Sequence, residues 1–190
     1  MTTREQIIEA ADLLFYHQGY AHTSFSHIAD AVKISRGNFY YHFKTKDAIL
    51  DAVITSRLVF TKGLLKQWED ASTTPTERIL SFVHILITNQ DKIIRYGCPV
   101  GTLNAELAKI DHPFQPAANK LFMLFRTWLK KQFIQLGCNE KADDYALHLL
   151  ARSQGVASLA NSFKDKKFIA REIDFMGEWL KQCCEKEALN

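Results

Sequence analysis

Residues 23–47 read TSFSHIADAVKISRGNFYYHFKTKD, and this stretch decides the fold that we expect. Ser24 can cap a first short helix that ends near Val32. After a turn of two residues, Ser35 can cap a second helix in the same way. Two short helices joined by a tight turn are typical of a helix-turn-helix motif.

The second of these helices has a local excess of positive charge. Residues 33–46 contain four Lys or Arg and no Asp or Glu, so the local charge is +4, whereas the formal charge of the whole chain is +3. Basic side chains interleaved with aromatic ones suit contacts with the phosphates and base edges of double-stranded DNA. The alternative is a packed helix pair with a solvated basic face, because this geometry also occurs without DNA.

The run from Ser35 to Asp47, together with the preceding Ile28-Ala29, resembles the N-terminal signature of the TetR/AcrR family of transcriptional regulators. The resemblance covers the first part of the chain. It implies an all-α homodimer, usually a repressor, that binds a palindromic operator and releases it when a small molecule enters the C-terminal domain.

The resemblance also implies roles for individual residues by their position. It implies base contacts from Arg36, Gly37, Asn38 and Tyr40, and phosphate contacts from Ser26, Tyr41, His42 and Lys46. Lys33 and Lys44 join this DNA-binding set because of their charge. Asn38 departs from the family pattern, in which a Thr or another small residue is common at that position.

The remainder of the chain also has apolar residues at helical spacing. We expect an all-α fold of about nine helices. An N-terminal three-helix DNA-binding domain would span residues 1–47, and a larger helical ligand-binding and dimerisation domain would span residues 48–190. No Pro- or Gly-rich linker separates the two, so we expect motion in one domain to reach the other.

Residues 75–136 carry more large apolar side chains than a single buried stripe needs. We expect a pocket for a small-molecule effector, lined by Phe82, Leu86, Cys98, Phe122, Met123, Phe125 and Trp128. The alternative is that these side chains simply fill a core. The neighbouring Arg95 and the helix that starts after Cys98 would favour the reactive thiolate form of Cys98, which would sense electrophiles or oxidants. The alternative is that Cys98 is a packed apolar thiol.

The last two expected helices, about residues 140–162 and 168–184, suit a four-helix dimer contact because small residues lie among the apolar ones. The residues expected in this contact are Tyr145, Leu149, Gly155, Leu159, Ile173, Met176 and Leu180. The alternative is that both helices only complete the core of a monomer.

The sequence lacks the motifs of the common enzyme classes. It has no Gly-rich phosphate loop, no His-Glu-x-x-His and no Gly-x-Ser-x-Gly, so we expect no catalysis and no cofactor. Its four cysteines, of which Cys183 and Cys184 are adjacent, lack metal-ligand spacing, so we expect no metal. Without a membrane-length apolar run or a signal peptide, we expect a cytoplasmic protein.

These observations together predict a ligand-responsive homodimeric repressor that a small apolar or electrophilic effector releases from DNA. The rival prediction is an architectural DNA-binding protein that tolerates many sequences and has no effector.

Overall fold

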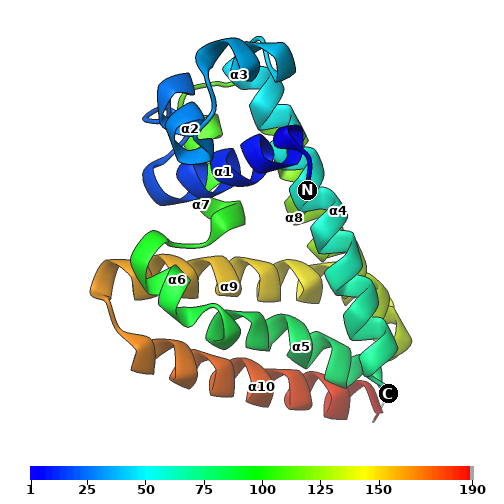
Figure 1. The fold of residues 1–190 in the computed structure, drawn as a ribbon. Helices are drawn as coiled ribbons and strands as arrows, with labels where there is room; N and C mark the ends of the chain where they lie inside the picture. The colour runs from blue at the N-terminus through cyan, green and yellow to red at the C-terminus, as the bar shows by residue number, and fades with distance from the viewer. Residues whose placement is uncertain (189–190) are drawn as a thin grey trace. The chain divides into compact units, whose positions relative to one another are not determined.

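The computed structural model describes residues 1–188, and it describes side chains for residues 1–183, so the side chain of Cys184 lies outside the described part. Within this part the chain is helical and contains no strand (Figure 1). The ten helices of the described part are α1 (Thr3–Gln18), α2 (Phe25–Val32), α3 (Arg36–His42), α4 (Lys46–Ala71), α5 (Pro75–Thr88), α6 (Gln90–Tyr96), α7 (Pro99–Lys109), α8 (Gln115–Gln135), α9 (Ala142–Phe163) and α10 (Lys166–Ala188). The all-α fold is therefore confirmed.

The structure has one helix more than the expected nine in its described part, because a break at Asn89 separates α5 from α6. This residue leaves the helical conformation, with φ −106° and ψ 13°, and its Nδ2 donates to the carbonyl of Ile85 at 3.0 Å. The side chain thereby competes with the backbone for a helical acceptor, which favours the end of a helix. α6 then starts at Gln90.

The chain divides into two compact units. Unit 1 contains Met1–Phe60 and Pro99–Leu121, and unit 2 contains Thr61–Cys98 and the residues from Phe122 onward. The boundary that we expected after residue 47 does not separate these units, because α4 continues through it and the chain returns to unit 1 at Pro99. The expected division into residues 1–47 and 48–190 is thus a proposal about function and not a description of compact units.

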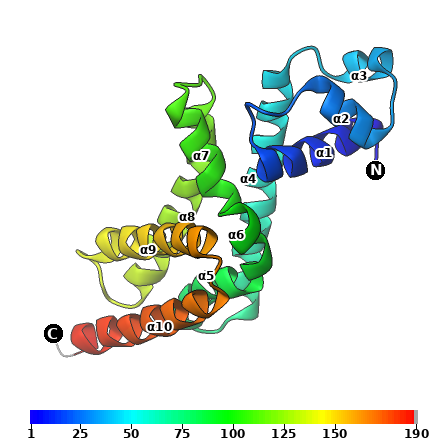
Figure 2. The same cartoon turned by 90° about the vertical axis from the view of Figure 1, so that its left-hand side faces the viewer.

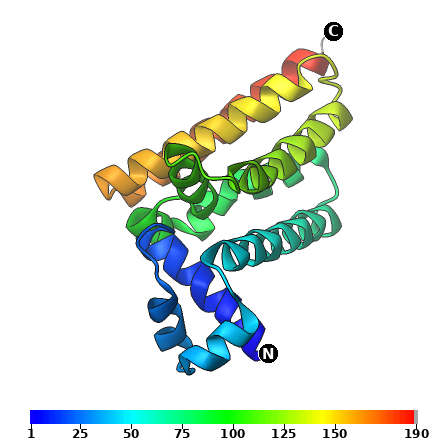
Figure 3. The same cartoon turned by 90° about the horizontal axis from the view of Figure 1, so that it is seen from above.

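In unit 1, α1, α2 and α3 pack around one core, and α2 and α3 lie next to each other (Figure 3). A capping box between Thr2 and Glu5 starts α1. The buried residues of this core from the N-terminal part of the chain are Ile7, Ala11, Phe15, Tyr20, Ile28, Ala29, Phe39 and Phe43, and α4, α7 and α8 add Ile49, Leu50, Val53, Ile54, Leu103, Leu107 and Ala118.

Unit 2 has its own core. α5 starts with a capping box between Thr74 and Glu77 and a proline at its first turn. α10 packs against α5 and α9, and α9 also packs against α6 (Figure 2). No described helix is long and apolar enough to cross a membrane.

Candidate nucleic-acid interface

Local caps fix the turn between α2 and α3. Ser24 Oγ accepts the N–H of His27 at 3.2 Å, and His27 Nδ1 accepts the N–H of Ser24 at 3.3 Å. α2 ends in a left-handed residue, Lys33, with φ 58°. Ser35 Oγ then accepts the N–H of Asn38 at 3.3 Å and caps α3. Both caps that the sequence predicts are therefore confirmed.

Most of the expected DNA-binding side chains face solvent. The exposed ones are Ser26, Lys33, Arg36, Gly37, Asn38, Tyr40, Tyr41 and Lys44, whereas His42 and Lys46 are partly buried. Tyr41 is 80% exposed, which is unusual for an aromatic side chain that has no external partner. A methyl group added at Gly37 would meet nothing within 4 Å, so the chain itself leaves this position open.

The core holds α3 through one aromatic side chain. Phe39 is almost fully buried, and its ring lies 5.1 Å from that of Phe25. The ring of Tyr40 packs edge-on against Phe25 at 5.4 Å. This contact fixes the direction of Tyr40 while the side chain remains about half exposed. The arrangement presents an oriented phenol to a partner of unit 1.

The two lysines that follow α3 differ in their contacts. Lys44 is exposed, and its Nζ donates to the carbonyl of Tyr40 at the end of α3. Lys46 donates to the carbonyls of Tyr20 at 2.9 Å and Thr23 at 3.2 Å, and its Nζ lies 4.1 Å from the centre of the Tyr20 ring. Its ammonium is therefore engaged within unit 1, and the phosphate contact that the resemblance implies for Lys46 has no support in this geometry.

Sequence reasoning missed Tyr20 and Glu106, whose contacts hold the segment just before α2 in place. Tyr20 is buried, and its hydroxyl donates to Asp47. Burial raises the pKa of the Tyr20 phenol far above its usual range, and the hydrogen bond to Asp47 raises it further, so the phenol stays protonated and can donate. Glu106 accepts two backbone N–H groups of the same segment. No local pattern links residues that are 86 positions apart.

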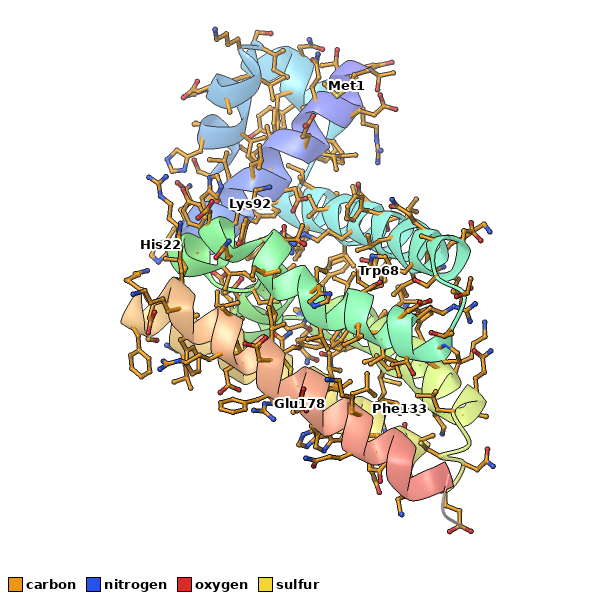
Figure 4. All side chains as sticks on the ribbon, turned by 90° about the horizontal axis from the view of Figure 1, so that it is seen from below. Met1, His22, Trp68, Lys92, Phe133 and Glu178 are labelled. Carbon is orange, nitrogen blue, oxygen red and sulfur yellow. The ribbon has the colours of Figure 1, made fainter. Side chains whose placement is uncertain are left out.

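The expected effector residues lie mostly inside the core of unit 2. Phe82, Leu86, Phe125 and Trp128 are buried in it, and Cys98 and Phe122 are partly buried against it. Figure 4 shows side chains filling the space between the helices around Trp68 and Phe133. Met123 does not join this group, because half of its surface is exposed.

The rings in this region contact one another directly. The Phe82 and Phe125 rings are 5.5 Å apart, and those of Trp68 and Trp128 are 5.6 Å apart. The Trp128 indole N–H donates to Glu69 at 3.1 Å. The side chains thus pack as a core in this state, and a ligand among them would have to displace some of these contacts.

The expected dimer residues separate into an inner and an outer set. Leu149, Ile173, Met176 and Leu180 are buried in the core of their own chain, which leaves them little surface for a partner. Tyr145 is partly buried, and Gly155 and Leu159 are exposed. The expectation for these inner four is therefore corrected, because they lie on the faces of α9 and α10 that form the core of the monomer.

The structure also shows which apolar side chains α9 and α10 leave exposed. They are Leu147, Leu159, Phe163 and Phe175, and Phe175 is 57% exposed. Between the two helices the ring of His148 stacks on Trp179 at 4.5 Å, and Arg152 pairs with Glu172. Among the described residues no group of three or more His, Cys, Asp or Glu could hold a metal ion.

Comparisons with known proteins agree with this geometry. Residues 7–53 match the family described as bacterial regulatory proteins, tetR family. The chain is 28% identical over 188 residues to an uncharacterized HTH-type transcriptional regulator in the lacX 3' region of Lactococcus lactis subsp. lactis, a match that covers 97% of this chain and 96% of that protein. It is 25% identical over 128 residues to the HTH-type transcriptional repressor DhaR of Mycobacterium sp. (strain GP1), covering 67% of this chain and 62% of that protein.

A solved structure extends the similarity to nearly the whole chain. The crystal structure of a TetR transcriptional regulator from Legionella pneumophila superimposes with a TM-score of 0.82 at 26% sequence identity. The match covers 94% of this chain and 97% of that one.

Proposed function

Because the chain belongs to the TetR family of bacterial transcriptional regulators, which bind DNA and are not enzymes, we propose that it is a homodimeric repressor released from its operator by a small molecule. The similarity to DhaR, which is named a repressor, supports the proposal that this chain represses transcription. A repressor acts where the DNA is, so we propose that the protein works in the cytoplasm.

One observation carries the proposed DNA contact. α3 exposes Arg36, Asn38, Tyr40 and Tyr41 within a stretch that has no acidic residue. Arg and Asn side chains read the edges of guanine and adenine in the major groove, and phenols bind phosphates. The open space at Gly37 allows the backbone of α3 to approach DNA closely.

The test starts from DNA that the wild-type chain selects out of a random duplex library. We expect a palindromic sequence, because a two-fold dimer reads two half-sites. Arg36→Ala and Tyr40→Ala should each weaken binding to this duplex by about 1–3 kcal/mol and change binding to a random duplex much less. If both variants bind the selected duplex like the wild type in fluorescence anisotropy, α3 is not the recognition helix.

We place the effector site in unit 2, among the aromatic residues around Phe82, Phe125 and Trp128. The large apolar side chains there suit an apolar ligand, and their close packing means that binding would shift neighbouring helices. A panel of apolar aromatic compounds should contain members that raise the melting temperature and release the selected DNA. If none does either, the effector part of the proposal fails.

Cys98 offers a second mode of sensing, because it is a partly buried thiol next to the start of α7. If N-ethylmaleimide releases DNA from the wild type and Cys98→Ser abolishes that response, the effector is an electrophile. If the variant responds like the wild type, Cys98 is a packed thiol and reversible ligand binding remains.

The architectural alternative predicts a different result in the same assay. Such a protein would bind the selected and the random duplex with similar affinity and with a steep dependence on salt.

A further inference from the structure

The segment of residues 19–23, which leads into α2, is held by a carboxylate from a distant helix. Glu106 lies in α7, and its Oε2 accepts the N–H of Tyr20 at 2.9 Å while its Oε1 accepts the N–H of Ala21 at 2.8 Å. Each oxygen therefore takes one backbone donor. Hydrogen bonds to a charged acceptor are stronger than neutral ones, and this pair also fixes the direction of the two peptide groups.

Gly19 makes room for this contact. It has φ +90°, and a Cβ atom built on it would lie 3.0 Å from Oε1 of Glu106. A side chain at position 19 would thus be strained and would also push the carboxylate away. The backbone at the end of α1 and the carboxylate of α7 fit each other closely.

α4 also holds this segment, and the ring of His112, between α7 and α8, packs edge-on against that of Tyr20 at 5.0 Å. Lys46 donates to the carbonyls of Tyr20 and Thr23, and the Tyr20 hydroxyl donates to Asp47. His112 Nδ1 accepts the N–H of Phe114, which leaves the proton of a neutral ring on Nε2, 3.5 Å from Asp47. The segment is therefore clamped between a carboxylate on one side and an ammonium on the other.

We infer that Glu106 is a positioning residue for DNA recognition, which sets the orientation of α2 and α3 through the peptide groups of Tyr20 and Ala21. This inference rests on the proposed operator binding. Ser24, the cap of α2, follows the clamped segment directly, so the segment determines where the helix-turn-helix motif begins. In a dimer, two recognition helices must match two half-sites, so a small error in orientation reduces specific binding more than non-specific binding.

The test compares Glu106→Gln with Glu9→Gln. Both changes remove one negative charge from unit 1, and Glu9 is exposed on α1. Removal of a negative charge alone should strengthen binding to DNA slightly, and Glu9→Gln should show this. Glu106→Gln keeps the shape but turns an NH₂ group toward one of the two backbone donors, so we expect operator binding to weaken by about tenfold.

Three readouts separate positioning from a purely structural role. In Glu106→Gln, binding to a random duplex should stay close to that of Glu9→Gln, whereas the melting temperature should fall modestly because a charge-assisted hydrogen bond is lost. Hydrogen exchange of the Tyr20 and Ala21 amides should become faster, while the amides within α2 stay protected. Gly19→Ala, which displaces the carboxylate, should weaken operator binding in the same selective way.

Two results would overturn the inference. One is operator binding by Glu106→Gln equal to that of Glu9→Gln. The other is a loss of random-duplex binding as large as the loss of operator binding, which would make the contact structural only. A wild-type chain that selects no DNA sequence would instead overturn the proposed function, before any variant is compared.

Discussion

At the scale of single residues, exposure and hydrogen bonding separate side chains that the sequence groups together. Lys44 and Lys46 are two positions apart and carry the same charge, yet only Lys44 is exposed. Lys46 donates to two carbonyls of unit 1 and lies over an aromatic ring. An ammonium with these partners stabilises the fold, whereas an exposed one is available to a phosphate.

The two lysines should therefore differ when each is replaced. Lys44→Ala should lower the slope of log K against log salt by about 0.9 without changing the melting temperature. Lys46→Met keeps the length of the side chain and should cost about 1–2 kcal/mol of stability through the lost charged hydrogen bonds. Titrations at several salt concentrations and urea unfolding measure the two effects. Equal salt slopes for both variants would contradict this assignment.

Gly37 provides a second test at this scale. An added methyl group meets nothing in the chain, so Gly37→Ala should fold normally and gain up to about 1 kcal/mol of helix stability. The same methyl group should obstruct DNA and weaken binding to the selected duplex. Gly63→Ala is the matched control, because Gly63 is exposed on α4 with equally open space. If the two variants bind DNA alike, the start of α3 does not approach DNA.

At the scale of helices, α9 and α10 use one face for the core of unit 2 and leave another exposed. Leu149 and Met176 are fully buried, while Leu159 and Phe175 are exposed. Large exposed apolar side chains on adjacent helices are typical of a contact with a partner. We propose that the partner is a second copy of the chain, because a palindromic operator requires one.

Gly155 tests this proposal without disturbing the monomer. A Cβ atom at this position would meet nothing in its own chain, so Gly155→Leu should preserve the melting behaviour of the monomer. If Gly155 faces a partner helix, the larger side chain should weaken dimerisation by about 1–3 kcal/mol through overpacking. Sedimentation velocity measures the shift, with Gly63→Leu as the control. A variant as dimeric as the wild type would remove Gly155 from the contact.

At the scale of the whole molecule, α4 and α8 connect the two units as continuous helices. The boundary between the units falls within each of them, after Phe60 in α4 and after Leu121 in α8. α4 supplies Val53 to the core of unit 1 and Leu65 to that of unit 2. Unfolding one unit alone would break both helices in their interior, so we expect the units to unfold together.

The positions of the tryptophans make this measurable. All three, Trp68, Trp128 and Trp179, belong to unit 2, so their fluorescence reports on that unit, whereas far-UV circular dichroism reports on the helices of both. At a fixed protein concentration the two signals should give the same urea midpoint. A circular dichroism transition with a second step would show that unit 1 unfolds separately.

The sequence by itself determined the features that depend on neighbours within a few residues. The caps Ser24 and Ser35 and the helices that follow them agree with the structure, because a capping side chain bonds to a backbone group only two or three residues away. The exposed side chains of α3 were predictable for a related reason, because the charge and the aromatic residues lie within one short stretch.

Only the tertiary structure decided which of several equivalent residues does what. α9 carries apolar residues on both faces, so the burial of Leu149 and the exposure of Leu159 depend on where α5, α6 and α10 pack against it. Glu106 is an ordinary helical glutamate in the sequence, and its role depends on backbone N–H groups 85 and 86 residues away. Periodicity gives the spacing of side chains along a helix, but contacts between distant helices determine which atoms each side chain meets.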